Sequence, residues 1–289
     1  MKLTACNICP RACGVDRSEI RGFCGEGKPA RVAKTMLHRW EEPCISGEGG
    51  SGAIFFSGCS LKCVYCQNGA ISRDGKGESL SASQLAELML ELQAQGAENI
   101  NLVTPTHFAS QIREALALLR GKLHIPTVWN TSGYETVETL RSLEGMVDIF
   151  LTDFKYFSAE LAARYSAAPD YPDVAAKALL EMVRITGVPV LEGGKLLRGT
   201  VVRHLVLPSH YRDSLDVLRQ IDSLVGASSV LLSLMAQYTP EFLRGDFPEL
   251  SRRITTYEYQ KVADEALRLG FDGFFQERDS ATDAFTPDF

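Results

Sequence analysis

Three cysteines, Cys59, Cys63 and Cys66, stand together in one short segment of the chain. Their C-x3-C-x2-C spacing places three soft thiolates in one loop, and thiolates are the ligands that select iron–sulfur clusters and zinc. A four-iron cluster held by only three protein thiolates keeps one iron open to an outside ligand. Open metal positions are typical of chemistry rather than scaffolding, as in catalytic zinc sites. The triplet therefore predicts a [4Fe–4S] cluster that binds a substrate or co-substrate; the alternatives are three buried apolar cysteines or part of a zinc knuckle.

A second set of cysteines lies at the start of the chain, with the spacing C-x2-C-x3-C-x10-C, and consists of Cys6, Cys9, Cys13 and Cys24. Four thiolates are enough to close a tetrahedral zinc site or to ligate a second cluster. This spacing matches neither the ferredoxin run nor a common zinc-finger pattern. Three possibilities stay open: zinc or another structural metal, an auxiliary [4Fe–4S] cluster, and free or disulfide-linked thiols.

The remaining cysteine is Cys44, and none of the eight cysteines lies beyond residue 66. Any centre ligated by cysteine must therefore be assembled from the N-terminal quarter of the chain. Cys44 itself is either a buried thiol or a side chain that faces the active site, as a hydrogen-atom donor or a neighbour of the cluster.

Composition narrows the class of protein. The 289 residues are 45% hydrophobic and 23% charged, as in an ordinary globular chain, and the formal net charge is −6. Lysine and arginine are not clustered into a basic stripe of the kind that binds a phosphate backbone, so we expect no nucleic-acid partner. The chain reaches a cysteine at position 6, before the apolar core of a signal peptide could form, and no stretch is apolar enough to cross a bilayer. We expect a soluble, cytoplasmic protein with reduced thiols and no membrane partner.

Beyond about residue 50, short apolar runs alternate with amphipathic segments, a pattern typical of a parallel sheet with helical crossovers. The runs show little alternation, as strands buried on both faces should. The predicted strands are Ala53–Phe56, Asn99–Val103, Pro126–Trp129, Val147–Leu151, Thr200–Leu207 and Val230–Leu234. The predicted helices are one that begins at Ser81 with a capping box to Gln84, and Ser110–Leu119, Glu135–Leu143, Val174–Ile185, Ser214–Val225 and Tyr257–Leu269.

Six strand–helix units, rather than eight, predict an α/β fold with an open, partial (β/α)6 TIM-like barrel. The cysteine triplet follows the first strand and would lie at the C-terminal mouth of the barrel, where such folds place chemistry. Residues 1–50 do not follow this rhythm and contain several glycines. We expect a small cysteine-rich extension over residues 1–50, packed on a barrel formed by residues 51–289.

The segment Cys59-x3-Cys63-x-Tyr65-Cys66 resembles the signature of the radical S-adenosylmethionine (SAM) superfamily. The resemblance implies that the three thiolates hold a [4Fe–4S] cluster, that SAM chelates the fourth iron, and that Tyr65 contacts the adenine. It also implies an oxidoreductase reaction. One-electron reduction cleaves SAM to methionine and a 5′-deoxyadenosyl radical, which then abstracts hydrogen from a substrate.

Within the superfamily, roughly residues 50 to 240 resemble the activating enzymes of glycyl-radical enzymes, such as the pyruvate formate-lyase activating enzyme. The segment Val147–Lys155 is similar to their fourth strand with its Asp-x-Lys ending, and Val202–Pro208 to a later strand that ends in a proline turn. The resemblance implies that Asp153 accepts hydrogen bonds from the SAM ribose and that Lys155 pairs with the methionyl carboxylate; the alternative is a structural ion pair. Arg203 is a further candidate contact for SAM or substrate, or else a packing residue.

Two departures from this family stand out. The Gly-Gly-Glu that commonly ends the second strand and receives the SAM amino group is replaced here by a segment in which Thr104 and Thr106 are candidate substitutes. In the third-strand turn, Asn130 stands where activating enzymes carry an aspartate near a monovalent cation. No cation site is therefore implied, and Asn130 is kept as a candidate cofactor contact. The N-terminal cysteine set resembles the extension of a little-characterised branch of activating-enzyme-like proteins.

The leading functional hypothesis is a radical SAM enzyme that abstracts hydrogen from a protein glycine, as in glycyl-radical-enzyme activation. The alternative is radical modification of a small molecule or a peptide, and a remote alternative is a non-catalytic iron–sulfur electron carrier or redox sensor. The expected partners are SAM, an electron donor such as flavodoxin or ferredoxin, and a protein substrate. The absence of cysteines after residue 66 disfavours classes that need a second cysteine-rich cluster in a C-terminal domain.

Overall fold

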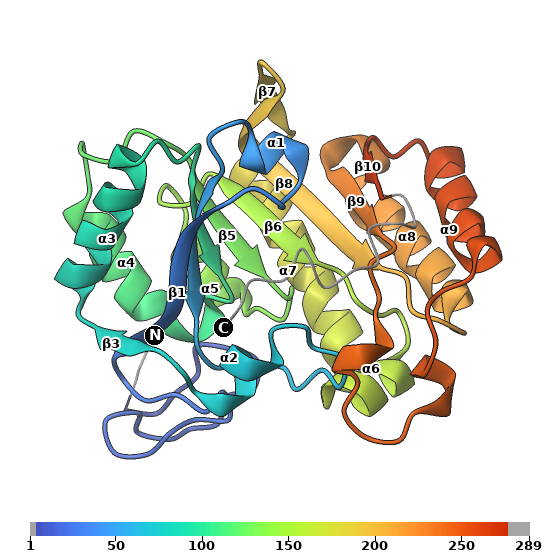
Figure 1. Cartoon of the computed structure of the whole chain (residues 1–289), viewed down its shortest axis with the longest axis horizontal. Helices are drawn as coiled ribbons and strands as arrows, with labels where there is room; N and C mark the ends of the chain where they lie inside the picture. The colour runs from blue at the N-terminus through green and yellow to red at the C-terminus, as the bar shows by residue number, and fades with distance from the viewer. Residues whose placement is uncertain (1–3, 277–289) are drawn as a thin grey trace.

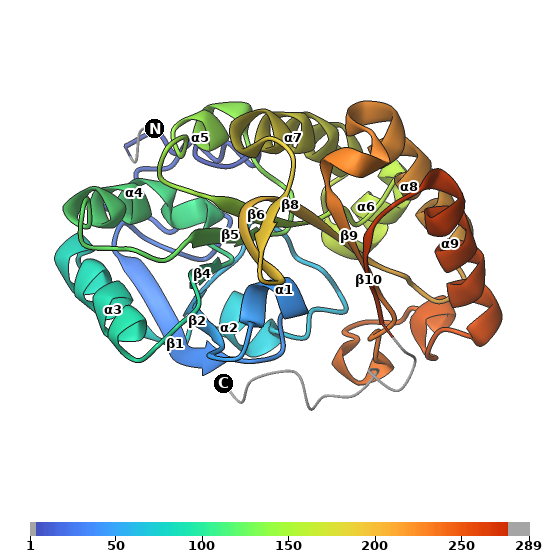
Figure 2. The same cartoon turned by 90° about the horizontal axis from the view of Figure 1, so that it is seen from above.

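The computed structural model describes residues 4–276, and within them ten strands form one mixed sheet. Its strand order is β10-β9-β8-β6-β5-β4-β2-β1-β3, with β7 paired to β8 beside this path. The sheet curves but does not close, because β3 and β10 form its two ends (Figure 2). The predicted partial barrel is confirmed.

The parallel part of the sheet contains all six predicted strands. These are β2 (Ser51–Phe56), β4 (Ile100–Val103), β5 (Thr127–Thr131), β6 (Ile149–Asp153), β8 (Lys195–Leu205) and β9 (Leu231–Met235). The short strand β10 (Gly273–Phe275) pairs in parallel with β9 and was not predicted. Two other unpredicted strands are β3 (Glu78–Leu80) and β7 (Val190–Glu192), both too short to show a pattern in the sequence.

Six helices cover the convex face of the sheet (Figures 1 and 2). They are α3 (Ala82–Ala94), α4 (Ala109–Leu118), α5 (Val137–Arg141), α7 (Tyr171–Thr186), α8 (Tyr211–Val225) and α9 (Thr256–Leu269). The predicted capping box at the start of α3 is present, with Ser81 accepting from the Gln84 N–H. The sequence missed α2 (Gly69–Asp74) and α6 (Ala159–Ser166), which lie at the lower end of the molecule in Figure 1.

The strands are buried on both faces, which explains their continuous apolar runs. On the convex side, Trp129 and Phe150 pack with residues of the surrounding helices. On the concave side, Val128 and Leu151 lie in a separate apolar cluster. Alternate residues of each strand therefore face either the helices or the interior of the barrel.

Strand β1 (Ala30–His38) belongs to the main sheet although it lies within the first fifty residues. It pairs antiparallel with β2, in a register that runs from Val32 opposite Phe56 to His38 opposite Ser51. Most of its side chains are only half-buried, and lysine and arginine interrupt the apolar pattern. Because of these features, the sequence pattern did not predict this strand.

Helix α1 (Pro43–Ser46) fills the part of the barrel interior that lies near the N-terminal ends of the parallel strands (Figure 2). Its Cys44 and Ile45 side chains are buried in the concave apolar cluster, whose other members are Val128, Ile149, Leu151, Leu196, Val201 and Leu231. The C-terminal ends of the parallel strands lie at the other end of the barrel from this plug (Figures 1 and 2). No helix among residues 4–276 is long and apolar enough to cross a membrane.

Candidate functional site

The three cysteines of the triplet lie in the loop that joins β2 to α2, at the C-terminal end of the first parallel strand. Gly58 opens this loop with a φ of +78°, a conformation that favours glycine. A Cβ atom at this position would lie 2.7 Å from the carbonyl oxygen of Cys24. Glycine thus lets the loop lie directly on the N-terminal segment.

A cavity of about 230 Å³ opens beside this loop. The predicted site residues that line it are Cys59, Cys63, Tyr65, Cys66, Thr104, Asn130, Asp153, Lys155 and Arg203. They come from the cluster loop and from the ends of β4, β5, β6 and β8, because parallel strands present their carboxyl ends at one edge.

Among the predicted cofactor-binding residues, Thr106 alone does not line the cavity. Its side chain is buried and donates to the Glu135 carboxylate at 2.7 Å, together with Thr131 and the Trp129 indole. Burial raises the pKa of Glu135. Thr106 therefore belongs to a polar cluster outside the cavity.

Asp153 and Lys155 form a partly buried ion pair at the end of β6. The Lys155 ammonium donates to one Asp153 oxygen at 2.5 Å, and Arg203 Nε donates to the other at 3.0 Å. Burial opposes the ionisation of Asp153, but Lys155 and Arg203 outweigh it and lower the pKa of this carboxyl. Burial also opposes the charge on Lys155, and the Asp153 carboxylate outweighs it and raises the pKa of Lys155. All three groups are charged at neutral pH.

Glu41 is a site residue that the sequence analysis missed. It lies in the segment between β1 and α1, and its carboxylate accepts from Arg203 Nη1 at 3.4 Å and from the amides of Asn130 and Asn101 at 3.2 and 3.0 Å. Burial raises the pKa of Glu41, and the Arg203 guanidinium partly offsets this effect. Arg203 also donates to the Asn130 side chain at 2.7 Å, so its guanidinium is held from three sides.

Thr104 has a φ of +59°, in the left-handed region that residues other than glycine rarely occupy. Its N–H donates to the Asn130 carbonyl at 2.9 Å, which holds the end of β4 against the end of β5. Such a conformation costs about 1–3 kcal/mol and is typical of functional sites. The strained residue stands where the resemblance places a Gly-Gly-Glu, and glycine would adopt this φ without strain.

The three thiols each have a polar neighbour. Cys59 Sγ accepts from the Leu61 N–H at 3.4 Å, Cys63 Sγ from the Ser166 hydroxyl at 3.0 Å, and Cys66 Sγ lies 3.5 Å from the Ser72 hydroxyl. Across residues 4–276, no three His, Cys, Asp or Glu side chains are spaced to hold a single metal ion. Three soft donors in one loop, with polar groups directed at the sulfurs, suit a larger group such as an iron–sulfur cluster.

A sequence profile described as the radical SAM superfamily matches residues 53–221. This chain belongs to the radical SAM superfamily. The superfamily consists of enzymes that use SAM radical chemistry, and its cofactors are a [4Fe–4S] cluster and SAM.

Two curated relatives come from Methanocaldococcus jannaschii. The chain is 30% identical to the uncharacterised protein MJ0674 over 276 residues, which cover 92% of this chain and 75% of the relative. It is 25% identical to the uncharacterised protein MJ0808 over 240 residues, which cover 74% of this chain and 63% of the relative.

Solved structures of SuiB from Streptococcus suis share the fold of this radical SAM chain. One is bound to the precursor peptide SuiA and the other to S-adenosylmethionine, and both superpose with a TM-score of 0.52. The alignments cover 77% and 76% of this chain and 48% of the SuiB chain, so the match spans about half of SuiB. At 11% and 12% identity these similarities concern the fold alone.

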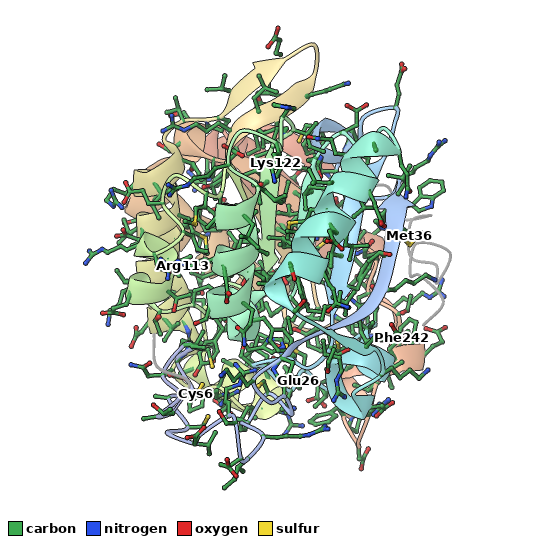
Figure 3. The ribbon with its side chains drawn as sticks, turned by 90° about the vertical axis from the view of Figure 1, so that its left-hand side faces the viewer. Cys6, Glu26, Met36, Arg113, Lys122 and Phe242 are labelled. Carbon is green, nitrogen blue, oxygen red and sulfur yellow. The ribbon has the colours of Figure 1, made fainter. Side chains whose placement is uncertain are left out.

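In this radical SAM chain the four N-terminal cysteines lie in one group beneath the cluster loop. Cys6, Cys9 and Cys24 are buried, and Cys13 is half-buried and forms a hydrogen bond with Cys6. Burial, together with the nearby Cys24 and Cys6 thiols, raises the pKa of Cys9 to about 12. Figure 3 shows Cys6 at the lower end of the molecule, on the same side as Glu26.

Two contacts join this group to the cluster loop. The Cys59 N–H donates to the Cys24 carbonyl at 3.2 Å. Arg11, which stands between Cys9 and Cys13, donates to the Ser60 carbonyl at 2.8 Å and to the Ala167 carbonyl at 2.5 Å. The N-terminal segment is therefore a structural support of the radical SAM cluster loop.

Cys44 does not line the cavity. Its thiol lies in the apolar cluster of the barrel plug, and burial raises its pKa to about 12. Of the two interpretations of this cysteine, the structure favours the buried thiol.

Proposed function

We propose that this chain reductively cleaves SAM at a [4Fe–4S] cluster held by Cys59, Cys63 and Cys66, and abstracts hydrogen from a glycine of a protein substrate. One observation carries the proposal. Three thiols and the Asp153–Lys155 ion pair, which are far apart in sequence, line a single cavity at the C-terminal mouth of the barrel. When bound, the cluster and SAM supply a radical that can abstract hydrogen from an unactivated C–H bond.

The chain's own side chains divide the work of holding SAM. Tyr65 offers an aromatic surface for the adenine, and the Asp153 carboxylate can accept from the ribose hydroxyls. Lys155 offers a cation for the methionyl carboxylate. Arg203 is held by Asp153, Asn130 and Glu41 and keeps the Asp153 carboxylate oriented. The buried Thr239 hydroxyl, which also lines the cavity, has no hydrogen-bond partner among residues 4–276 and is available to a bound group.

The first experiment tests the chemistry. The chain is reconstituted with iron and sulfide under anaerobic conditions, and dithionite and SAM are added. We expect 5′-deoxyadenosine in the wild type and in Cys44→Ala, and none in Cys59→Ala. A wild-type yield of 5′-deoxyadenosine no higher than that of Cys59→Ala contradicts the proposal. That result favours the alternative function, a non-catalytic electron carrier or redox sensor.

The second experiment tests the substrate. With flavodoxin or ferredoxin as electron donor, a partner protein that carries a glycyl-radical domain should acquire an EPR doublet. The competing function is radical modification of a peptide or a small molecule, and the fold shared with SuiB, whose structure holds a precursor peptide, supports the peptide version. Deoxyadenosine without any doublet, together with a mass change in a peptide or small molecule, favours that alternative.

We further propose that Cys6, Cys9, Cys13 and Cys24 bind a second iron–sulfur cluster rather than a zinc ion, since no three His, Cys, Asp or Glu side chains among residues 4–276 are spaced to hold a single metal ion. The grouped thiols support this, and so does the buried Arg17 guanidinium. Burial raises the pKa of Cys24, Arg17 partly offsets this effect, and its charge can offset the negative charge of a thiolate centre. Metal analysis of the wild type beside a Cys9→Ala/Cys13→Ala variant tests it. Identical iron contents in the two proteins contradict it.

A further inference from the structure

A line of hydroxyl groups connects the SAM cavity to one of the cluster thiols. Tyr65 lines the cavity, and its hydroxyl lies 2.5 Å from the Tyr156 hydroxyl. The Tyr156 hydroxyl lies 2.8 Å from the Ser166 hydroxyl, which donates to Cys63 Sγ at 3.0 Å. All three hydroxyl-bearing side chains are buried.

The direction of this line follows from the chemistry of its last member. A thiolate that ligates iron carries no proton and can only accept, so Ser166 must donate to Cys63. Because a serine hydroxyl has one proton, Ser166 must then accept from Tyr156, and Tyr156 must accept from Tyr65. The protons therefore all point from the SAM cavity toward the cluster.

The backbone fixes the geometry of the contact between Ser166 and Cys63. The carbonyls of Tyr165 and Ser166, at the C-terminal end of α6, accept from the N–H groups of Val64 and Lys62 at 2.8 and 3.4 Å. Arg11 Nη2 also donates to the Ser166 carbonyl, at 3.3 Å. The end of α6 and the cluster loop are thus held together on both sides of Cys63.

We propose that Ser166, Tyr156 and Tyr65 form a directed hydrogen-bond relay that raises the reduction potential of the SAM cluster and makes this potential respond to occupancy of the SAM cavity. The inference rests on the proposed function. Reduction adds negative charge to the cluster and its thiolates, and a hydrogen bond to a ligating sulfur stabilises that charge. Each donor in a chain polarises the next, so Tyr156 and Tyr65 strengthen the bond that Ser166 makes.

Ser166 contacts the cluster ligand directly, and Tyr156 and Tyr65 are positioning residues that act through it. A purely structural role, in which the three hydroxyls only satisfy one another, predicts lower stability on mutation with an unchanged potential. The midpoint potential therefore separates the two roles.

The test is an EPR-monitored redox titration of the reconstituted protein, with and without SAM. Ser166→Ala should shift the midpoint potential to a more negative value, and Tyr156→Phe should shift it in the same direction by less. The change in potential that SAM causes in the wild type should shrink in Tyr156→Phe. Tyr134→Phe is the matched control, because this buried tyrosine bonds to Asp170 at 2.8 Å, outside the relay, and should leave the potential unchanged.

The outcomes distinguish the relay from the proposed function. Wild-type potentials in both Ser166→Ala and Tyr156→Phe, with cluster content and SAM binding intact, overturn the relay alone. A wild-type cluster that does not respond to SAM overturns the proposed function as well. If Ser166→Ala does not retain a cluster, the midpoint potentials of Tyr156→Phe and Tyr65→Phe test the relay instead. Both variants leave the hydrogen bond from Ser166 to Cys63 in place.

Discussion

The backbone N–H of Cys59 donates a hydrogen bond to the carbonyl oxygen of Cys24 at 3.2 Å. The first cysteine of the cluster loop thus rests on the last cysteine of the N-terminal set. This contact needs a close approach of the two segments, which Gly58 allows because it has no Cβ atom. Support of the cluster loop by the N-terminal segment can be tested at this glycine.

Gly58→Ala should destabilise the protein and lower its capacity for iron. The added Cβ would lie 2.6 Å from Glu26 Cγ and 2.7 Å from the Cys24 carbonyl oxygen. The matched control is Gly96→Ala, because Gly96 has a similar φ of +89° and no atom within 4 Å of the added carbon. Both variants should lose about 1 kcal/mol to left-handed backbone strain, and Gly58→Ala should lose about 1–3 kcal/mol more to the collision.

Urea unfolding of the cluster-free proteins and iron content after reconstitution provide the two measurements for this glycine pair. Equal losses of stability in the two variants, with equal iron content, would show that the contact with Cys24 does not support the loop.

Asp153→Asn should cost about 1–3 kcal/mol of unfolding free energy at pH 7, because it leaves the partly buried Lys155 and Arg203 cations without their carboxylate. Glu144→Gln is the control. It breaks the solvent-exposed Glu144–Arg184 pair and should leave stability close to that of the wild type. Urea unfolding measures both, and a loss for Asp153→Asn no larger than that of the control would contradict the predicted role of this ion pair.

Cys44→Ala should retain the yield of 5′-deoxyadenosine and lose about 1 kcal/mol of stability, because the thiol packs in the plug and does not line the cavity. The product is quantified after anaerobic reconstitution, beside Cys59→Ala. A yield as low as that of Cys59→Ala would instead assign Cys44 to the reaction.

Glu258→Gln should cost about 2 kcal/mol at pH 7. The Arg252 guanidinium and the N–H groups of Thr255 and Ser209 lower the pKa of Glu258 to about 2 against the effect of burial. Because the folded pKa lies below the unfolded value of about 4.3, the stabilisation is fully present above the unfolded pKa. This stabilisation is lost as the pH falls through the pKa of Glu258 in the folded protein.

The difference in unfolding free energy between wild type and Glu258→Gln should therefore narrow from pH 7 to pH 3, as measured by urea unfolding at each pH. Glu91→Gln, at an exposed position of α3, should change stability by less than about 0.5 kcal/mol throughout. A difference for Glu258→Gln that is constant with pH would show that the carboxylate charge does not stabilise the fold.

Local patterns in the sequence predicted the fold well. Six buried strands, six helices and the capping box at Ser81 follow from periodicity and spacing over a few residues, and the structure contains them all. The position of the cysteine triplet at the mouth of the barrel also follows, since the triplet directly follows the first parallel strand. Strand β1 was not predicted, because its mostly half-buried side chains show no regular alternation of apolar and polar residues.

The candidate site likewise contains some residues that local sequence identifies and some contacts that only the tertiary structure creates. The sequence by itself determined the three thiols of one loop and the Asp153–Lys155 pair, since these residues are neighbours along the chain. Only the tertiary structure decided that the Glu41 carboxylate accepts a hydrogen bond from Arg203, 162 residues away. The same is true of the hydrogen bond from Ser166 to Cys63, which are 103 residues apart. The tertiary structure also decided that Thr106 donates to Glu135 outside the cavity. The physical reason is that sheet register and crossover connections bring such pairs together, and no short window of sequence contains both partners.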